Sequence, residues 1–489
     1  MVRTRRDVLQ GAAGAMVLGL TGLDLVASAA AQPVRIRRNL NRLPPGDRTL
    51  EIYRRAVRLM HELPANDRRN WARQAKLHND NCAHKNWLFL PFHRAYLRYF
   101  EHIIRELTGE AEFALPYWDW SESPRLPAAF VGANEPLDPR FWPDPDPNID
   151  GRTHANGRPR QEREIVAGQS IPISRPAFRR VLTLKDFRAF GGGKVRTHRD
   201  RGRPGQLESG AHDTVHLSIS GHMAYNFSPL DPVFWLHHAN IDRLWAEWNQ
   251  KSRNTNPTDR DWRNYDFRNV FTNRRGQLLA SVKVSEVTSL APLGYTYDTL
   301  AGIEIAAASA GPIVHAMRQT RASRPKLRKL EAPVGVAVEL GRTTVLSLPL
   351  GDFDLDAVLA KSFPSDYEPE ADDRRIYLTL AGVTAPTLGD DFFVRVFIGT
   401  PGATAQTSDV DLGFVDQFAF FNTAHAGHGD NNALEFSFDI VDTLRNLKAV
   451  NRLPSGTLDV QLVPVAFEGR MPDPAGARFS VGSVAAEVR

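Results

Sequence analysis

Two histidine-bearing segments constrain this chain more than any other feature. The first runs from His84 to Arg94 with the sequence HKNWLFLPFHR, and the second runs from Asp231 to Trp245 with the sequence DPVFWLHHANIDRLW. Imidazole is costly to bury without a partner, and it is the most common neutral nitrogen ligand of metals in proteins. Each segment places histidine among large apolar residues and leads into a helical pattern. The two segments therefore predict a metal site built between helices.

Apolar periodicity predicts which parts of the first half are helical. Stripes at helical spacing cover Thr49 to Leu63, His93 to Gly109 and Phe234 to Trp248. In the last of these, one stripe includes His237 and a competing stripe includes His238, so spacing alone leaves the choice between them open. Residues 121–210 are rich in Pro, Gly, Arg and Asp, which predicts long surface excursions with little regular structure.

The second half changes to the pattern of a β domain. Short β-branched runs alternate with Gly, Pro and Asp turns, as in Thr343–Leu348, Arg375–Leu380, Phe392–Ile398, Leu434–Asp439 and Thr457–Val463. Such a series is typical of a β-sandwich. We therefore expect an α+β multidomain protein, with a mainly α catalytic core at 32–300, a linker at 301–335 and a C-terminal β-sandwich domain at 336–489.

The first 31 residues are expected to be a targeting segment. Arg5-Arg6 precedes a mildly apolar run and small-residue cleavage sites such as Ala29-Ala30-Ala31. Paired arginines favour the twin-arginine export machinery, and a Sec signal with a chance Arg-Arg is the alternative. Asp24 and the many Gly and Ala residues disfavour a stable membrane anchor. We therefore expect residues 1–31 to be a twin-arginine-type signal peptide, and the mature protein to be periplasmic or secreted.

Charge and cysteine content narrow the possible functions. The formal net charge is +5, from 61 basic and 56 acidic residues, and no nucleic-acid motif accompanies this small excess. Nucleic acid is therefore not expected among the partners. Cys82 is the only cysteine, so an intrachain disulfide is impossible.

Six histidines are the candidate metal ligands, in an upstream and a downstream set of three: His78, His84 and His93, then His212, His216 and His238. His212 and His216 are four residues apart, which puts their rings on one face of a helix. Three neutral imidazoles per ion, without a second thiolate or an obvious carboxylate, suit copper or zinc better than calcium or magnesium. Two adjacent sites of this kind can hold metals about 3.5–4 Å apart. A mainly antiparallel four-helix bundle would supply the ligands from its facing side chains.

The motifs around these histidines resemble those of the tyrosinase and catechol oxidase (polyphenol oxidase) family of type-3 binuclear copper enzymes, over residues 40–300. The copper A pattern of that family is matched by His84, Phe89, Phe92-His93-Arg94 and Glu101, and the copper B pattern by Asp231-Pro232, Phe234-Trp235, His238 and Asp242. In the family the second of the paired histidines is the ligand, which implies His238. His78 resembles the first copper A ligand, with His61 as the alternative. Pro116–Trp120 and Tyr295–Tyr297 also look familial.

The resemblance implies a bacterial exported oxidoreductase with two copper ions as cofactors. Its substrates would be phenolic small molecules and O2, with o-diphenols oxidised to o-quinones, and hydroxylation of monophenols (monooxygenase activity) is left open. A haemocyanin-like O2-binding protein without turnover and a zinc-bridged binding module are the alternatives from other classes. Asp242, one turn from His238, is a candidate to orient a ligand ring.

Further roles follow from the same resemblance. Cys82-Ala83-His84 is similar to the fungal arrangement in which a cysteine is thioether-linked to the middle copper A histidine. Glu208 resembles the glutamate that holds a water near copper B, and Asp213 stands where monophenol-hydroxylating members usually have asparagine. Because Asp213 would flank the entrance without a cation, we expect dopamine and tyramine to be preferred over DOPA and tyrosine. The C-terminal β domain is expected to pack over the copper site and restrain activity, as in plant and fungal relatives.

Overall fold

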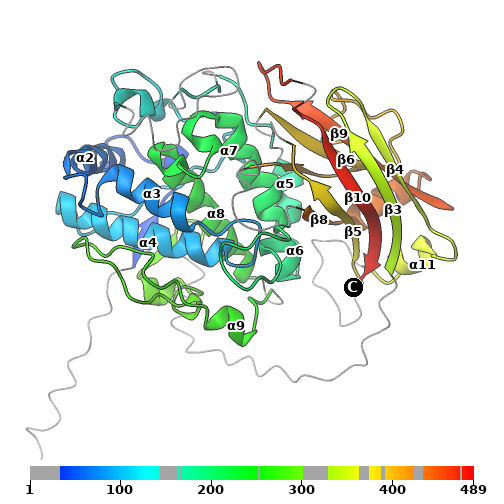
Figure 1. Cartoon of the computed structure of the whole chain (residues 1–489), viewed down its shortest axis with the longest axis horizontal. Helices are drawn as coiled ribbons and strands as arrows, with labels where there is room; N and C mark the ends of the chain where they lie inside the picture. Colours follow the sequence, from blue (N-terminus) through cyan, green and yellow to red (C-terminus); the bar gives the residue numbers. More distant parts are fainter. Residues whose placement is uncertain are drawn as a thin grey trace, which may run out of the picture.

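In the computed structural model, an α-helical half and a β half lie side by side (Figure 1). The described residues are 34–143, 162–165, 168–173, 175–251, 254–300, 329–362, 374–386, 391–421, 433–473 and 476–489. The expected signal peptide and most of the expected linker, 301–328, lie outside these ranges. Within them, no helix combines the length and the apolarity that crossing a bilayer requires. The mixture of helices and sheets confirms the α+β class.

Three long helices carry most of the α-helical core, which comprises the described residues of 34–300. They are α2 (Thr49–Glu62), α4 (Phe89–Thr108) and α8 (Val233–Asn249), and they confirm the predicted helices, although α4 begins at Phe89 rather than at His93. α4 ends where Gly109 adopts a φ of 72° and donates its N–H to the carbonyl of Arg105, a left-handed C-cap. α8 is buried on every face along nearly its whole length, so it is the central helix of the core.

Two shorter helical segments hold the remaining helical histidines. α3 (Trp71–Asn81) begins at Asn70, whose side chain accepts the N–H of Ala72. Downstream, the π-helical turn η4 (Leu207–His212) runs directly into α7 (Asp213–Ile219). The sequence predicts an ordinary helix at His212, but in the π turn the N–H of Asp213 reaches back to the carbonyl of Glu208. Single π turns of this kind are frequent at functional sites.

The described part of the segment 121–210 is short of regular structure, as predicted, but it is not a surface excursion. Its described part holds η2 (Ala128–Phe130), η3 (Pro139–Phe141), α5 (Arg175–Val181) and α6 (Phe187–Gly191). Phe130, Phe187 and Phe190 are buried in the main hydrophobic core. The prediction of exposure is wrong because Pro and Gly mark breaks in regular backbone, whereas a few buried aromatic rings are enough to hold a loop against a core.

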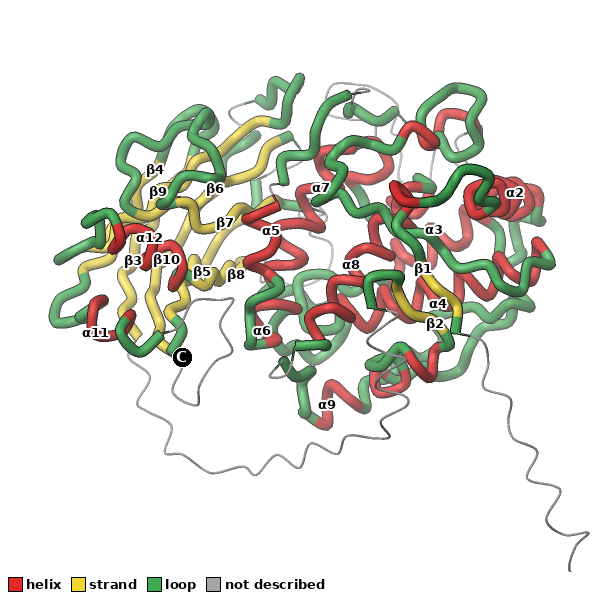
Figure 2. Tube along the Cα trace, turned by 180° about the vertical axis from the view of Figure 1, so that it is seen from behind, coloured by secondary structure: helices red, strands yellow, loops and turns green. Residues whose placement is uncertain are grey.

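The β half, here called the β domain (described residues of 329–489), contains two four-stranded antiparallel sheets (Figure 2). The strand orders are β3-β10-β5-β8 and β4-β9-β6-β7. The strands are β3 (Lys329–Val338), β4 (Thr344–Pro349), β5 (Ile376–Thr384), β6 (Phe392–Ile398), β7 (Phe414–Ala419), β8 (Ala433–Asp439), β9 (Thr457–Ala466) and β10 (Phe479–Val488). Two helices, α11 (Leu355–Leu359) and α12 (Val441–Ala449), accompany them. Apolar side chains from both sheets, such as Leu346 and Phe436, belong to one hydrophobic cluster.

The sequence predicts β4, β5, β6, β8 and β9, but not β3, β7 and β10. Because β3 begins at Lys329, the predicted linker at 301–335 extends too far into the β domain. Pro333 and Gly335 make this stretch an improbable strand by composition. β3 nevertheless forms because it is an edge strand, where one side of the backbone has no neighbour to bond.

The β domain packs against the part of the core formed by η4 and α7. The side-chain amide of Gln417 in β7 donates to the carbonyl of Pro172 at 2.8 Å and to the hydroxyl of Thr214 at 3.3 Å. Gln206, just before η4, donates to the carbonyl of Ser437 in β8 at 3.0 Å. An apolar cluster beside these bonds mixes residues of both halves: Leu217, Ala224, Phe393, Ala419, Phe421 and Phe467. The β domain therefore covers the face of the core from which two candidate ligands project.

Candidate metal centre

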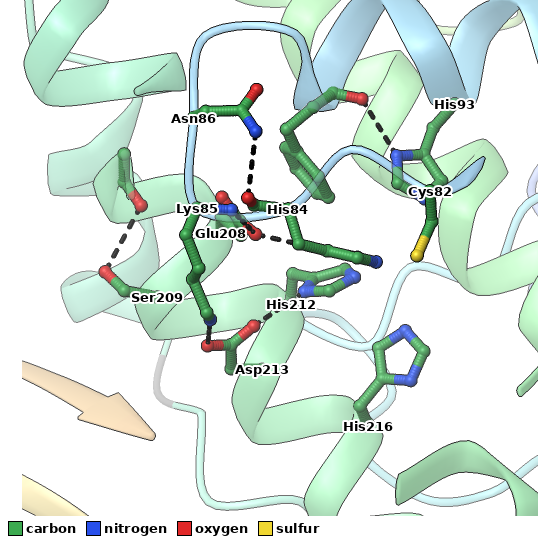
Figure 3. Close-up of polar contacts among 12 residues, drawn as sticks. Cys82, His84, Lys85, Asn86, His93, Glu208, Ser209, His212, Asp213 and His216 are labelled. Carbon is green, nitrogen blue, oxygen red and sulfur yellow. Dashed lines mark hydrogen bonds and ion pairs between the residues drawn. The ribbon is translucent and has the colours of Figure 1, made fainter. Parts of the chain in front are cut away.

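The six predicted histidines converge at one buried position in the core. They come from α3, the loop before α4, α4, η4, α7 and α8, and Figure 3 shows His84, His93, His212 and His216. In the upstream set, His78 Nε2 lies 3.2 Å from His93 Nε2, and in the downstream set, His216 Nε2 lies 3.2 Å from His238 Nε2. The rings of His93 and His238 stack at 4.2 Å between centroids, which connects the two sets. All six histidines thus lie close enough to share a metal centre.

Hydrogen bonds at Nδ1 determine which nitrogen of each ring is free. Three Nδ1 atoms donate to backbone carbonyls: His78 to Asn226 (2.6 Å), His93 to Phe89 (2.8 Å) and His216 to Met223 (2.6 Å). A carbonyl can only accept, so each of these Nδ1 atoms carries the proton and leaves a lone pair on Nε2. His84 and His212 have carboxylates in the same role, with Glu208 at 3.2 Å and Asp213 at 2.8 Å. Five of the six rings are therefore oriented to ligate through Nε2.

The centre is built for neutral imidazoles and a cation. Burial lowers the pKa of His78 to about 4 and that of His216 to about 3, and it lowers the pKa of the other four rings well below the ordinary value. At neutral pH the rings are uncharged acceptors. The Nε2 atoms of His84 and His212 have no hydrogen-bond partner in the described part of the chain. Buried lone pairs that face one another are satisfied by a metal ion, and an all-imidazole donor set suits copper or zinc.

A buried polar network lies beside the histidines (Figure 3). Lys85 forms an ion pair through Nζ with Asp213, and its backbone N–H donates to Glu208 Oε1 at 2.7 Å. Lys85 is 1% exposed and has a φ of 61°, a left-handed conformation that non-glycine residues rarely adopt. Burial raises the pKa of both carboxyl groups, and the Lys85 charge opposes this rise. The network ties the loop that carries His84 to the helix that carries His212.

Asp213 does not offer an unpaired charge at a site entrance, so that prediction is wrong. The residue is fully buried, and its carboxylate accepts from His212, from Lys85 and from the backbone N–H of Phe421. The sequence places Asp213 next to His212, but the cation comes from a residue 128 positions away. The expected preference for dopamine over DOPA therefore loses its electrostatic basis.

Asp242 does not orient a ligand ring, contrary to the prediction. Its carboxylate instead accepts from four buried side chains, which are Arg37, Arg94, Tyr295 and Tyr297. His238 Nδ1 has no hydrogen-bond partner within the described ranges. The Asp242 network joins α4 and α8 to the two short parallel strands β1 (Arg35–Arg37) and β2 (Tyr295–Tyr297). Asp242 therefore holds these elements of the core together.

His61 and Cys82 occupy different positions relative to the centre. The His61 ring stacks on Trp142 at 3.8 Å and on Trp71 at 5.5 Å between centroids, at the end of α2 and outside the group of six. This position favours His78 over His61 as the third upstream ligand. The Cys82 sulfur lies within 4.8 Å of ring nitrogens of both His78 and His84. The position of Cys82 is therefore compatible with the predicted thioether to His84.

Sequence reasoning misses two features of the site. Phe421 follows β7, is fully buried, and places its ring 4.3 Å from the ring of His216 and 5.3 Å from that of His84. The aromatic run at 418–421 is a signal for a core, but nothing in it shows which ring lies over the histidines. The second feature is the Trp120 bond: His237, which the sequence offers only as the competitor of His238, packs beside the downstream set and accepts the indole N–H of Trp120 at Nδ1.

Fold and site together define a metalloprotein with a buried, all-histidine centre for two adjacent ions. Residues 56–251 match the family model for the common central domain of tyrosinase, and residues 340–484 match a domain of unknown function (DUF7868). Tyrosinase HcTyr1 of Hahella sp. (strain CCB-MM4) is 28% identical over 476 residues, which are 88% of this chain and 95% of that protein. A chloroplastic polyphenol oxidase of Malus domestica is 30% identical over 291 residues, which are 52% of this chain and 48% of that protein. The chain thus spans about half the length of this plant relative.

Two solved structures have the same overall fold. Latent apple tyrosinase aligns with a TM-score of 0.61 at 21% identity, over 94% of this chain and 98% of that chain. Latent aurone synthase (polyphenol oxidase) aligns with a TM-score of 0.65 at 24% identity, over 94% of this chain and 90% of that chain. These two structures show the fold, whereas the family model and the named relatives support the assignment of the chain to the tyrosinase and polyphenol oxidase family of type-3 copper oxidoreductases, whose cofactor is a pair of copper ions.

Proposed function

We propose that the protein uses O2 to oxidise o-diphenols to o-quinones. The observation that carries the proposal is the convergence of six buried histidines, five of which keep a free Nε2 lone pair. The upstream set would hold copper A and the downstream set copper B, with α3, α4, α7 and α8 as the four helices that position them. The copper pair supplies reversible electron exchange with O2. The chain keeps the rings neutral and, in five of the six, fixes the orientation through the bond at Nδ1.

O2 consumption with catechol, measured on the copper-loaded protein, tests this proposal. His93→Asn should lose both O2 consumption and bound copper, because it removes a ligand from α4. His102→Asn changes a histidine of the same helix that lies outside the group of six, so it should retain both. Reversible O2 binding without turnover would identify a haemocyanin-like carrier instead, and zinc retained after copper reconstitution would identify a zinc-bridged module.

We also propose that Glu208 is the residue on which any hydroxylation of monophenols depends. Its Oε2 is buried without a hydrogen-bond partner among the described residues, so it has a free acceptor for a water or a phenol proton. Both oxygens of Asp213 are already engaged, by His212 and Lys85, which suits a positioning role for Asp213. Glu208→Gln should lower tyramine hydroxylation about 10²-fold relative to catechol oxidation. An unchanged ratio of the two rates would contradict this assignment.

The β domain is proposed to restrain the activity. The Phe421 ring occupies space against His216 and His84 that a diphenol ring would need to reach the metals. Trypsin or mild SDS should therefore raise diphenol turnover by removing or releasing the domain. The expected cleavage segment, Arg318 to Lys329, lies almost entirely outside the described residues. Unchanged turnover after confirmed cleavage would leave the β domain with a purely stabilising role.

Cys82 is proposed to be covalently linked to His84. A bond from Cys82 Sγ to His84 Cε1 would replace one S–H and one C–H bond, and O2 would take up the two electrons and two protons. The sulfur's position within 4.8 Å of a ring nitrogen of His84 supports this proposal. After copper loading in air, the peptide mass should fall by two hydrogens, and Cys82→Ser should show no such change. Full alkylation of Cys82 in the loaded protein would rule the link out.

Export by the twin-arginine route is proposed from residues 1–31. Replacing Arg5 and Arg6 by lysine should leave the unprocessed precursor in the cytoplasm of a bacterial host. Periplasmic or secreted protein at the usual level would favour the Sec route.

A further inference from the structure

Four histidines, rather than three, surround the copper B position. His237 lies beside the downstream set, and one nitrogen of each of the four rings falls within 4.8 Å of the others. The His237 ring centroid is 4.9 Å from that of His216 and 5.3 Å from that of His212. The residue is fully buried, and its Nε2 has no hydrogen-bond partner in the described part of the chain. A fourth imidazole bound here would fill the open position that a catalytic metal requires.

Trp120 determines which nitrogen of His237 carries the proton. The indole N–H of Trp120 donates to His237 Nδ1 at 3.1 Å, and both side chains are buried. Indole can only donate, so Nδ1 is the acceptor and the neutral ring carries its proton on Nε2. The Nδ1 lone pair is therefore engaged by Trp120, and Nε2 has no lone pair to offer. In this tautomer neither nitrogen can bind a metal.

The neighbouring histidine rings have the opposite tautomer, with the proton on Nδ1. His212 and His216 donate from Nδ1, to Asp213 and to the carbonyl of Met223, and so keep Nε2 free. If His237 adopted that tautomer, its Nδ1–H would point at the Trp120 N–H, and two donors would face each other without solvent. The hydrogen-bond partner at Nδ1 therefore determines whether a ring can bind a metal, and for His237 that partner prevents it.

We propose that Trp120 is a positioning residue that keeps His237 out of copper B coordination, so that copper B has three imidazole ligands and an open position. The inference rests on the proposed dicopper site. The two proposals are tested separately. A wild-type protein that binds two coppers and oxidises catechol supports the dicopper site, whatever the results for the Trp120 variants.

Trp120→Phe tests the proposal, because it removes the donor but keeps an aromatic ring against Phe178. X-ray absorption of the copper-loaded variant should give more than three imidazoles per copper, and catechol turnover should fall about tenfold or more. The double variant Trp120→Phe/His237→Phe should return both values to those of the wild type. Trp118→Phe is the matched control, since it loses an N–H bond to the Ser123 carbonyl rather than one to His237, and it should keep the wild-type imidazole count.

Two results would overturn the proposal: an imidazole count in Trp120→Phe equal to that of Trp118→Phe, or a double variant that stays as impaired as Trp120→Phe. His237→Phe alone gives an independent check that does not depend on folding of the Trp120 variants. It should retain three imidazoles per copper. A lower count in His237→Phe would show that His237 is itself a ligand, which would also overturn the proposal.

Discussion

Replacing Phe421 by alanine should relieve the restraint that we propose for the β domain. The ring is fully buried and lies 4.3 Å from the His216 ring and 5.3 Å from the His84 ring. It belongs to the apolar cluster that joins the two halves, together with core residues such as Leu217. Truncating a fully buried phenylalanine costs about 3–5 kcal/mol. Since the ring bridges the halves, a large part of this free energy stabilises the docked β domain.

A loss of about 3 kcal/mol in docking free energy changes the ratio of released to docked protein by roughly 150-fold. Only part of the cost acts on docking, so we expect diphenol turnover of the uncleaved chain to rise about 10- to 100-fold. The rise should shrink after trypsin cleavage, because the wild type is then released as well.

The assay is the initial rate of O2 consumption with catechol, at matched copper per chain, before and after cleavage. Phe467→Ala is the control, because Phe467 lies in the same cluster and packs on Phe393 at 5.3 Å but has no ring contact with a histidine among the described residues. It should weaken docking without uncovering the site, and so raise turnover less. Equal activation by the two variants would refute a direct covering role for the Phe421 ring. Wild-type turnover in uncleaved Phe421→Ala with full copper would refute the restraint itself.

Three further predictions concern buried charges. Burial raises the pKa of Asp416, which lies where β7 meets η4, to about 7, above its ordinary value of 3.8. Docking of the β domain is therefore strongest below about pH 4 and weakens as the pH rises toward 7, so turnover should rise with pH. Asp416→Asn should flatten this rise in turnover. Lys85→Met should cost about 3–5 kcal/mol in the free energy of unfolding, because it leaves Asp213 as an uncompensated buried charge, and Lys85→Met/Asp213→Asn should recover most of that loss in urea denaturation. Asp242→Asn should also cost about 3 kcal/mol or more at pH 7. Burial raises the pKa of Asp242, but the positive charges of Arg94 and Arg37 outweigh this effect and hold the pKa below 3.8. The stabilisation by Asp242 is thus present above that pH and lost as pH falls through the folded pKa, so the difference from wild type should be smaller at pH 2 than at pH 7.

The sequence by itself determines the features that depend on local spacing. The apolar stripes of α2, α4 and α8 recur at helical period, and the alternating runs of β4, β5, β6, β8 and β9 recur at strand period, so both can be predicted without the fold. The six histidines stand out because their ring type is rare among large apolar residues and because their motifs are long. Composition fails where it is the sole guide, as in the buried loops of 121–210 and in β3, which contains Pro and Gly.

The tertiary structure alone decides the state of each side chain in the site. The Lys85–Asp213 pair joins residues 128 positions apart, and the Trp120–His237 bond joins residues 117 positions apart. Phe421 reaches the histidines from the other half of the molecule. Which nitrogen of a ring is protonated, whether a carboxylate has a cation beside it, and which ring lies against the histidines are all set by the nearest atoms in space. No period along the chain records those neighbours, because they are brought together only when the whole core packs.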